Sequence, residues 1–286
     1  MTRFASNTMT ATIEMVRAGG RILRVAHWRL GEPSDHPPIL FFNGIGANIE
    51  VLSPLAERLT ERGFVMFDMP GTGESPDPAI PYNPATISWT AAQILDRLGL
   101  DQVDVMGISW GGAIAQQFAL QHPGRTRRLV LAATTAGMPM VPGDPASLGQ
   151  LIDPSRYADP RFLNELFMSL YGGMARREGI EADHIGRLKP PSPVGYAYQL
   201  FAIAGWTNLP ALPLLNKEVL IMMGADDTIV PPINGNILAT AIPNSRLEVF
   251  EGGGHLFLLT HACQSVACLR DFLDAPPSAA ELKRAA

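Results

Sequence analysis

The stretch that decides the fold reads Val103-Asp104-Val105-Met106-Gly107-Ile108-Ser109-Trp110-Gly111-Gly112-Ala113. Residues Val103–Met106 are mostly apolar and predict a short buried strand, whereas the run that begins at Trp110 predicts a helix. Glycines on either side of Ser109 allow strand and helix to pack closely around a sharp turn, because they carry no side chains. Strand, turn and helix in this order predict a nucleophile elbow, which exposes a serine above a sheet.

Short apolar runs alternate with helical patterns on both sides of this turn, and that order favours a parallel sheet covered by helices. An antiparallel pair, Thr12–Met15 and Arg21–Trp28, is expected to open the chain around the turn Gly19-Gly20. The other expected strands are Ile39–Phe42, Phe64–Asp68, Leu129–Ala132, Val219–Met223 and Arg246–Phe250. The expected helices are Val51–Arg62, Pro84–Leu98, Trp110–Gln121, Pro232–Ala241 and Leu258–Leu273.

The alternation breaks between residues 137 and 215, which are rich in Pro, Gly, Met and aromatic side chains. Helical patches occur there at Pro160–Tyr171 and Val194–Ala204, without a clear strand. We therefore predict a core domain of residues 1–136 and 216–286, with residues 137–215 inserted as a helical cap. The alternative is a set of extra core helices that have no role over the site.

A serine hydroxyl is a poor nucleophile until a base takes its proton. In this architecture the acid and then the histidine follow the serine along the chain. His184 falls in the expected cap and His261 on the last expected helix, whereas His255 follows the last expected strand in a glycine-rich loop. That loop can carry an imidazole to the sheet edge where ligands bind. We predict His255 as the general base.

Two adjacent aspartates compete for the role of the acid that orients His255. They lie in the loop that starts at Gly224, directly after an expected strand. Asp227 is third after that glycine and fourth before Pro231, a placement typical of the acid in such loops. We predict Asp227 as the acid and expect Asp226 to hydrogen-bond within the turn.

A tetrahedral oxyanion needs two backbone donors. One is the amide after the nucleophile, here Trp110, and the other comes from the loop that follows Ile39–Phe42. In that loop we predict the amide of Ile45, which has a glycine on either side. The glycine-rich turn Asp68–Ser75 lacks the lysine and the spacing of a phosphate-binding loop, so we expect a structural role beneath the site.

Composition excludes several functions. The 286-residue chain has a net charge of −5, which argues against nucleic acid as a partner. No apolar run reaches the roughly 18 residues of a transmembrane helix, and the polar start lacks the apolar core of a signal peptide. Cys263 and Cys268 lie five positions apart on one expected helix and point in different directions, so we expect no bridge between them and a cytoplasmic location. No cluster has metal-ligand spacing, and we predict no metal and no organic cofactor.

These blocks, in the order serine, aspartate, histidine, resemble the α/β-hydrolase superfamily along nearly the whole chain. Asn43 stands where most members have histidine, and we expect its side chain to brace the loop. Longer stretches resemble the intracellular depolymerases of medium-chain-length poly(3-hydroxyalkanoate). They include Phe42–Asn48, Ile108–Ala119, Leu129–Thr134 and Gly254–Leu258.

The resemblance implies hydrolysis of ester bonds between 3-hydroxyacyl units, through an acyl-enzyme on Ser109. It implies an apolar ester or polyester as substrate and association with storage granules. One alternative is a general carboxylesterase or lipase on small acyl esters. Others are a cofactor-free perhydrolase, a C–C hydrolase, and a non-catalytic relative that binds a small ligand or coats a granule. Chain-length preference and oligomeric state have no signal in the sequence.

Overall fold

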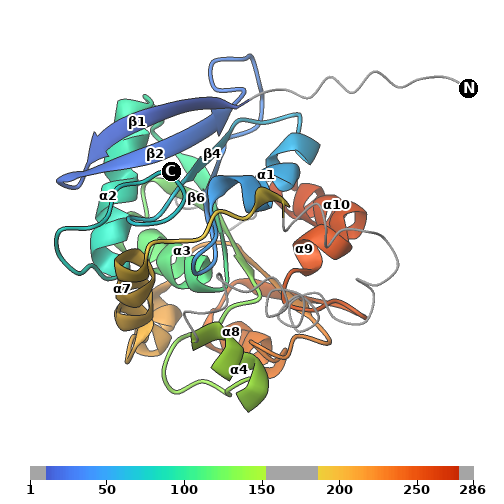
Figure 1. Ribbon diagram of the computed structural model, residues 1–286. Coiled ribbons are helices and arrows are strands. Elements are labelled where there is room, and N and C mark those ends of the chain that lie inside the picture. The colour runs from blue at the N-terminus through green and yellow to red at the C-terminus, as the bar shows by residue number, and fades with distance from the viewer. Residues whose placement is uncertain (1–10, 153–185, 277–286) are drawn as a thin grey trace, which may run out of the picture.

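The computed structural model describes residues 11–152 and 186–276, and this part of the chain contains one eight-stranded sheet (Figure 1). The strand order is β1-β2-β4-β3-β5-β6-β7-β8. The hairpin β1–β2 is antiparallel and β2 pairs antiparallel with β4, while all the other pairs are parallel. The strands are β1 (Thr12–Ala18), β2 (Arg21–Trp28), β3 (Ile39–Phe42), β4 (Phe64–Phe67), β5 (Val103–Ile108), β6 (Thr126–Ala132), β7 (Val219–Gly224) and β8 (Ser245–Phe250).

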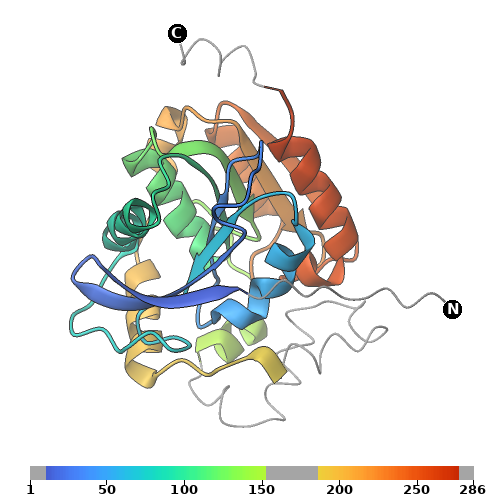
Figure 2. The same ribbon diagram turned by 90° about the horizontal axis from the view of Figure 1, so that it is seen from above.

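Helices cover both faces of this sheet (Figure 2). One face packs against α2 (Pro84–Arg97), α3 (Trp110–Gln121) and α8 (Ile233–Ala241). The other face packs against α1 (Ile49–Arg58), α9 (Phe257–Thr260) and α10 (Ala262–Leu273). Strands β3, β4, β5 and β7 are buried at every position, which explains why they read as continuous apolar runs. The predicted parallel sheet with flanking helices is confirmed.

Two helices differ by two residues or more from the sequence expectation, and α1 (Ile49–Arg58) also ends four residues before the expected end at Arg62. Helix α1 starts two residues early, at Ile49, because the Ile49 amide donates to Asp68 Oδ1 at 2.7 Å and so gains a partner from after β4. The last expected helix is two helices, α9 and α10, which are separated at His261 (φ −110°, ψ 36°). The early start of α1 thus depends on a side chain that is distant in the sequence, which side-chain periodicity does not report.

The segment between β6 and β7 contains α4 (Pro145–Ile152), α7 (Pro193–Ile203) and the 3₁₀ helix η3 (Leu209–Leu214). The expected helix Pro160–Tyr171 lies outside the described residues. A β-bridge between Gly137 and Thr207 joins the two ends of the segment, so the chain leaves the sheet and returns to it at nearly the same point. Among the described residues, no helix is long and apolar enough to cross a membrane.

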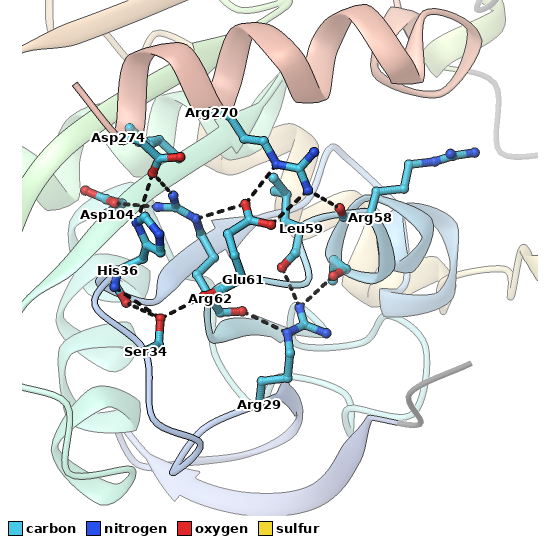
Figure 3. A network of polar contacts seen from close by, with 12 residues as sticks. Arg29, Ser34, His36, Arg58, Leu59, Glu61, Arg62, Asp104, Arg270 and Asp274 are labelled. Carbon is cyan, nitrogen blue, oxygen red and sulfur yellow. Dashed lines mark hydrogen bonds and ion pairs between the residues drawn. The ribbon is translucent and has the colours of Figure 1, made fainter. Parts of the chain in front are cut away.

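Buried ion pairs lie at the amino ends of the parallel strands, opposite the carboxyl ends that position Ser109. Figure 3 shows the part of this network around Arg62. Arg62, just before β4, has a fully buried side chain and contacts Asp104 and Asp274. Arg127 binds the two oxygens of Asp104 through Nε and Nη2, at 2.8 and 2.6 Å. The Asp104 carboxylate therefore joins the starts of β4, β5 and β6.

Replacing Asp104 with alanine tests this arrangement. Asp104→Ala leaves a buried guanidinium without one of its carboxylate partners, and we expect a loss of about 3–5 kcal/mol in the free energy of unfolding. The control is Asp96→Ala, which removes a surface ion pair with Arg125 in which the Asp96 side chain is 61% exposed. Its expected cost is below about 1 kcal/mol. Urea unfolding followed by circular dichroism measures both, and equal losses would contradict the prediction.

Candidate active site

Ser109 lies between β5 and α3 in a strained backbone conformation, with φ 54° and ψ −121°. Three hydrogen bonds hold this turn. The Ser109 amide donates to the Ala132 carbonyl at 2.9 Å, and the Ser109 carbonyl accepts from Gly112 N at 2.9 Å and from Thr134 Oγ1 at 2.8 Å. A positive φ in a residue other than glycine persists only when the surroundings impose it. Here the end of β6 and the first turn of α3 impose it, and the serine side chain remains partly exposed.

The neighbouring glycines are required by close contacts. A Cβ on Gly107 would lie 2.2 Å from the Gly111 carbonyl oxygen, and a Cβ on Gly111 would lie 2.0 Å from the Phe42 carbonyl oxygen. Both distances are far below van der Waals contact, so any side chain here would push α3 away from β3 and β5. The glycines at these positions are therefore required because α3 packs too closely against β3 and β5 to leave space for a Cβ.

Asp227 and His255, predicted from separate loops, meet in the structure. His255 Nδ1 donates to Asp227 Oδ2 at 2.8 Å, and both side chains are almost completely buried. The other carboxylate oxygen of Asp227 accepts from the amides of Ile229 and Val230, each at 2.9 Å. Because a carboxylate only accepts, Nδ1 carries the proton and Nε2 is left as the basic nitrogen. Among the described residues, no hydrogen bond joins Nε2 to the Ser109 hydroxyl, a contact that often closes only with substrate.

The competing candidates lie elsewhere. The Asp226 side chain is exposed, while the Asp226 amide donates to the Gly253 carbonyl at 2.9 Å and so links the loop after β7 to the loop after β8. A Cβ on Gly224 would lie 2.4 Å from the Gly253 and Gly254 carbonyl oxygens, so the two loops are in direct backbone contact. His261 Nδ1 pairs with Thr260 Oγ1 within the α9–α10 junction. His184 lies outside the described residues.

The loop after β3 lies directly against the serine. A Cβ on Gly44 would lie 3.7 Å from Ser109 Cβ. The Gly46 amide donates to Gln199 Oε1 at 2.9 Å, and the Ala47 amide donates to the Gly44 carbonyl at 3.2 Å. Within the described part of the chain, the Ile45 amide has no acceptor, so it remains available to a ligand, as does the Trp110 amide at the start of α3.

Asn43 braces this loop, as expected, since its Nδ2 donates to the Asn48 carbonyl at 3.2 Å. Asp68, from the turn Asp68–Ser75, supports the same region from below through its bond to the Ile49 amide. Burial raises the pKa of the Asp68 carboxyl to about 6, and hydrogen bonds from the Ile49 and Glu74 amides and from Arg24 offset this only in part. The turn is therefore structural in the described chain, and it contacts the loop after β3.

Ion pairs also connect the turn Asp68–Ser75 to Glu50 on α1 and to Lys189, which lies shortly before α7. Arg24 binds Glu50 at 2.7 Å and Asp68 at 3.2 Å, and Lys189 Nζ binds Glu74 at 2.5 Å. Burial would raise the pKa of Glu50, but hydrogen bonds from Arg24 and Asn48 outweigh it and lower the pKa to about 2. The ionised Glu50 thus remains bound to its partners at neutral pH.

The sequence analysis did not identify Gln199 or Asn234, which connect the β6–β7 segment to the site loops. Asn234 on α8 accepts from the Val141 amide at 3.0 Å and donates to the Val141 carbonyl at 2.8 Å. The one available signal for Gln199 was its position as a single amide side chain within the otherwise apolar or aromatic run Tyr196–Ile203. Among the described residues, no group of three or more His, Cys, Asp and Glu has the arrangement of a metal site.

Comparison with known proteins decides the family. The model of the alpha/beta hydrolase family matches residues 39–267. A poly(3-hydroxyalkanoate) depolymerase of Ectopseudomonas oleovorans is 41% identical over 238 residues, which make up 82% of this chain and 84% of the relative. The chain belongs to the alpha/beta hydrolase family. This membership confirms the fold and the resemblance that the sequence motifs indicated.

Two further relatives share less of their sequence with this chain. A 2-hydroxymuconate semialdehyde hydrolase of Pseudomonas putida is 32% identical over 223 residues, 74% of this chain and 77% of the relative. The crystal structure of the enol-lactonase from Burkholderia xenovorans LB400 has a TM-score of 0.80 at 21% identity, covering 92% of this chain and all of that one. At such identity the likeness concerns the fold alone.

The two aspartates give a matched pair of variants. Asp227→Asn replaces the acceptor of the His255 Nδ1 proton with an amide, which favours the wrong tautomer, and we expect turnover to fall about 10⁴-fold. Asp226→Asn alters an exposed side chain and should change turnover less than about threefold by the ordinary tolerance of surface positions. Steady-state hydrolysis of p-nitrophenyl butyrate measures both. The reverse ranking would move the acid to Asp226.

Proposed function

We propose that this α/β hydrolase is a serine hydrolase that cleaves carboxylic ester bonds through an acyl-enzyme, with medium-chain-length poly(3-hydroxyalkanoate) as its substrate. The observation that carries the proposal is the buried Asp227–His255 hydrogen bond, beside the edge where β5 delivers Ser109. An oriented histidine, a serine on a strained turn and two unoccupied amides are the parts that acyl transfer requires.

In the first half of the reaction, His255 Nε2 takes the proton of the Ser109 hydroxyl as the oxygen attacks the ester carbonyl. Asp227 stays ionised and stabilises the imidazolium through its Oδ2. The negative charge that develops on the carbonyl oxygen is bound by the amides of Ile45 and Trp110. Each such donor is worth about 3 kcal/mol of transition-state stabilisation.

Collapse of the tetrahedral intermediate breaks the ester bond. The imidazolium of His255 gives its proton to the departing alkoxide, which for a polyester is the 3-hydroxyl end of the next unit, and Ser109 keeps the acyl group. Water then attacks the acyl-enzyme with His255 again as the base, and the carboxylic acid leaves. Atoms and protons balance over the two halves without a metal or an organic cofactor.

The β6–β7 segment supports an apolar substrate. Residues 190–215 contain no charged side chain. Within this stretch Val194, Phe201 and Leu214 are 44%, 69% and 77% exposed, so apolar surface faces outward on α7 and η3. A contiguous exposed apolar patch marks a surface that binds other apolar matter, and we propose that these side chains belong to one. We assign residues 137–215 to a cap over the core of residues 1–136 and 216–286, with a polyester granule surface as its partner.

One relative points to the same substrate by its name. The poly(3-hydroxyalkanoate) depolymerase of Ectopseudomonas oleovorans is 41% identical to this chain over 238 residues, which are most of both lengths. The second candidate is hydrolysis of a carbon–carbon bond, which the 32% identity to the 2-hydroxymuconate semialdehyde hydrolase favours. A general carboxylesterase acting on small acyl esters would keep the same triad and differ only in the cap.

Hydrolysis of polymer is the test of the substrate. A latex of medium-chain-length poly(3-hydroxyalkanoate) should release 3-hydroxy acids with the wild-type protein, and Ser109→Ala should abolish both this release and labelling by a fluorophosphonate probe. Brisk turnover of p-nitrophenyl esters without release from the latex would support the carboxylesterase. Consumption of 2-hydroxymuconate semialdehyde without ester turnover would support the second candidate. Labelling that persists in Ser109→Ala would reject the nucleophile.

Phe201 tests the contact with the polymer surface. Phe201→Gln removes a large exposed apolar side chain, whose burial against polymer contributes about 1.5–3 kcal/mol. We expect the rate on latex to fall about tenfold, the rate on p-nitrophenyl butyrate to stay within twofold, and thermal stability to be unchanged. Trp89→Gln, at a side chain that is 53% exposed on α2, is the control. Equal effects of both variants on latex would contradict a role specific to α7.

A further inference from the structure

Gln199 on α7 is completely buried, and both ends of its carboxamide are bonded. Its Oε1 accepts from the Gly46 amide at 2.9 Å, and its Nε2 donates to Thr72 Oγ1 at 2.7 Å. A backbone amide can only donate, so the oxygen must face Gly46 and the nitrogen must face Thr72. One side chain thus links α7, the loop after β3 and the turn Asp68–Ser75, which lie far apart in the sequence.

The bond to Gly46 acts directly beside the proposed oxyanion donor. Gly46 follows Ile45, and its φ of 70° belongs to a region that glycine enters freely. A glycine there gives the loop several backbone conformations of similar energy, which would turn the Ile45 amide in different directions. Fixing the Gly46 N–H on a buried acceptor selects one of them. Because Gly46 N is occupied, the Ile45 amide is the neighbouring donor that remains for an oxyanion.

Gln199 itself is held in place, because α7 sits tightly on the turn Asp68–Ser75. A Cβ on Gly195 would lie 2.6 Å from Gly71 Cα, so the two backbones touch. The Ser192 amide donates to the Gly71 carbonyl at 2.8 Å, and the Ser192 hydroxyl bonds to Asp77. Figure 1 shows α7 below α2, at the end of the segment that returns toward the sheet. The packing of α7 against the turn Asp68–Ser75 therefore determines the position of the Gln199 oxygen.

We infer that Gln199 is a positioning residue. Through its bond to Gly46, the position of α7 determines the conformation of the loop after β3 and so the direction of the Ile45 amide. The inference rests on the proposed function, because it takes Ile45 N as an oxyanion donor. It adds that the proposed cap takes part in catalysis through a hydrogen bond to the core, in addition to contacting substrate. Gln199 touches neither Ser109 nor the reacting carbonyl.

Gln199→Met tests the role, since methionine has a similar length and its thioether is only a weak acceptor for the Gly46 N–H. Loss of one oxyanion donor lowers kcat by about 10²–10³-fold, so a misdirected donor should lower kcat by about 10–100-fold. KM for p-nitrophenyl butyrate should stay within twofold. The dissociation constant of an alkyl boronic acid, whose serine adduct mimics the tetrahedral intermediate, should rise by the same factor as kcat falls.

Gln116→Met is the matched control, because Gln116 is equally buried and its Nε2 bonds only to the Thr135 carbonyl, at 2.9 Å. It should lower thermal stability without the joint change in kcat and boronate affinity. Thr72→Val is a second test that conserves shape and keeps Gln199. It frees the carboxamide from one partner and should lower kcat several-fold at unchanged KM.

The outcomes separate the inference from the proposed function. If Ser109→Ala abolishes ester hydrolysis while Gln199→Met and Thr72→Val keep wild-type kcat and boronate affinity, the positioning role is wrong and the serine mechanism stands. The same fall in kcat and boronate affinity in Gln116→Met would also overturn it, because any buried amide would then matter equally. If ester hydrolysis persists in Ser109→Ala, the proposed function itself fails.

Discussion

The contact between the first turn of α3 and the ends of β3 and β5 is the constraint on which the rest of the site depends. Gly107 and Gly111 leave no room for a Cβ there, so the chain must turn abruptly between them. Ser109 absorbs this turn with a positive φ, an arrangement that costs of order 1–3 kcal/mol and persists because the surrounding packing is over-determined. Because α3 lies so close to β3 and β5, the chain can pass from strand to helix only through this sharp turn, which leaves the Ser109 side chain partly exposed.

The ends of the β6–β7 segment are attached to the loops that surround this serine. Val141, near its start, is bound through both backbone groups to Asn234, which closely follows the loop of Asp227. Near its other end, Gln199 binds the loop of Ile45. A segment that differs in composition from the core is thus joined to the proposed acid on one side and to the proposed oxyanion donor on the other. Under the proposed function, these two attachments connect the segment that contacts substrate with the loops that carry the acid and the oxyanion donor.

Local patterns in the sequence were sufficient for the sheet and for the sharp turn at Ser109, because each depends on residues adjacent in the chain. The roles of Ser109, Asp227 and His255 stay predictions, although the structure brings Asp227 and His255 into contact. The choice of Asp227 over Asp226 was harder, since it depends on which carboxylate turns toward a loop 28 residues away. The hydrogen bond between Gln199 and Gly46 joins residues 153 positions apart, so no periodic pattern in the sequence could predict it. The early start of α1 arises from a tertiary contact, the bond of the Ile49 amide to Asp68, which side-chain patterns do not report.

The ion pair between Arg62 and Asp274 has a consequence for how the protein is made. The two residues are separated by 212 positions, and the arginine side chain is fully buried at the start of β4. During synthesis Arg62 leaves the ribosome long before its partner Asp274, and β7 and β8 are also made late. The sheet is complete only after β8 and its ionic edge only after Asp274 have left the ribosome, so until then α1 alone, among the described helices, covers the face of β3–β6 on which α9 and α10 later pack. Contacts between such distant residues make folding slow, and this exposed interval is the stage at which chaperone binding would compete with aggregation.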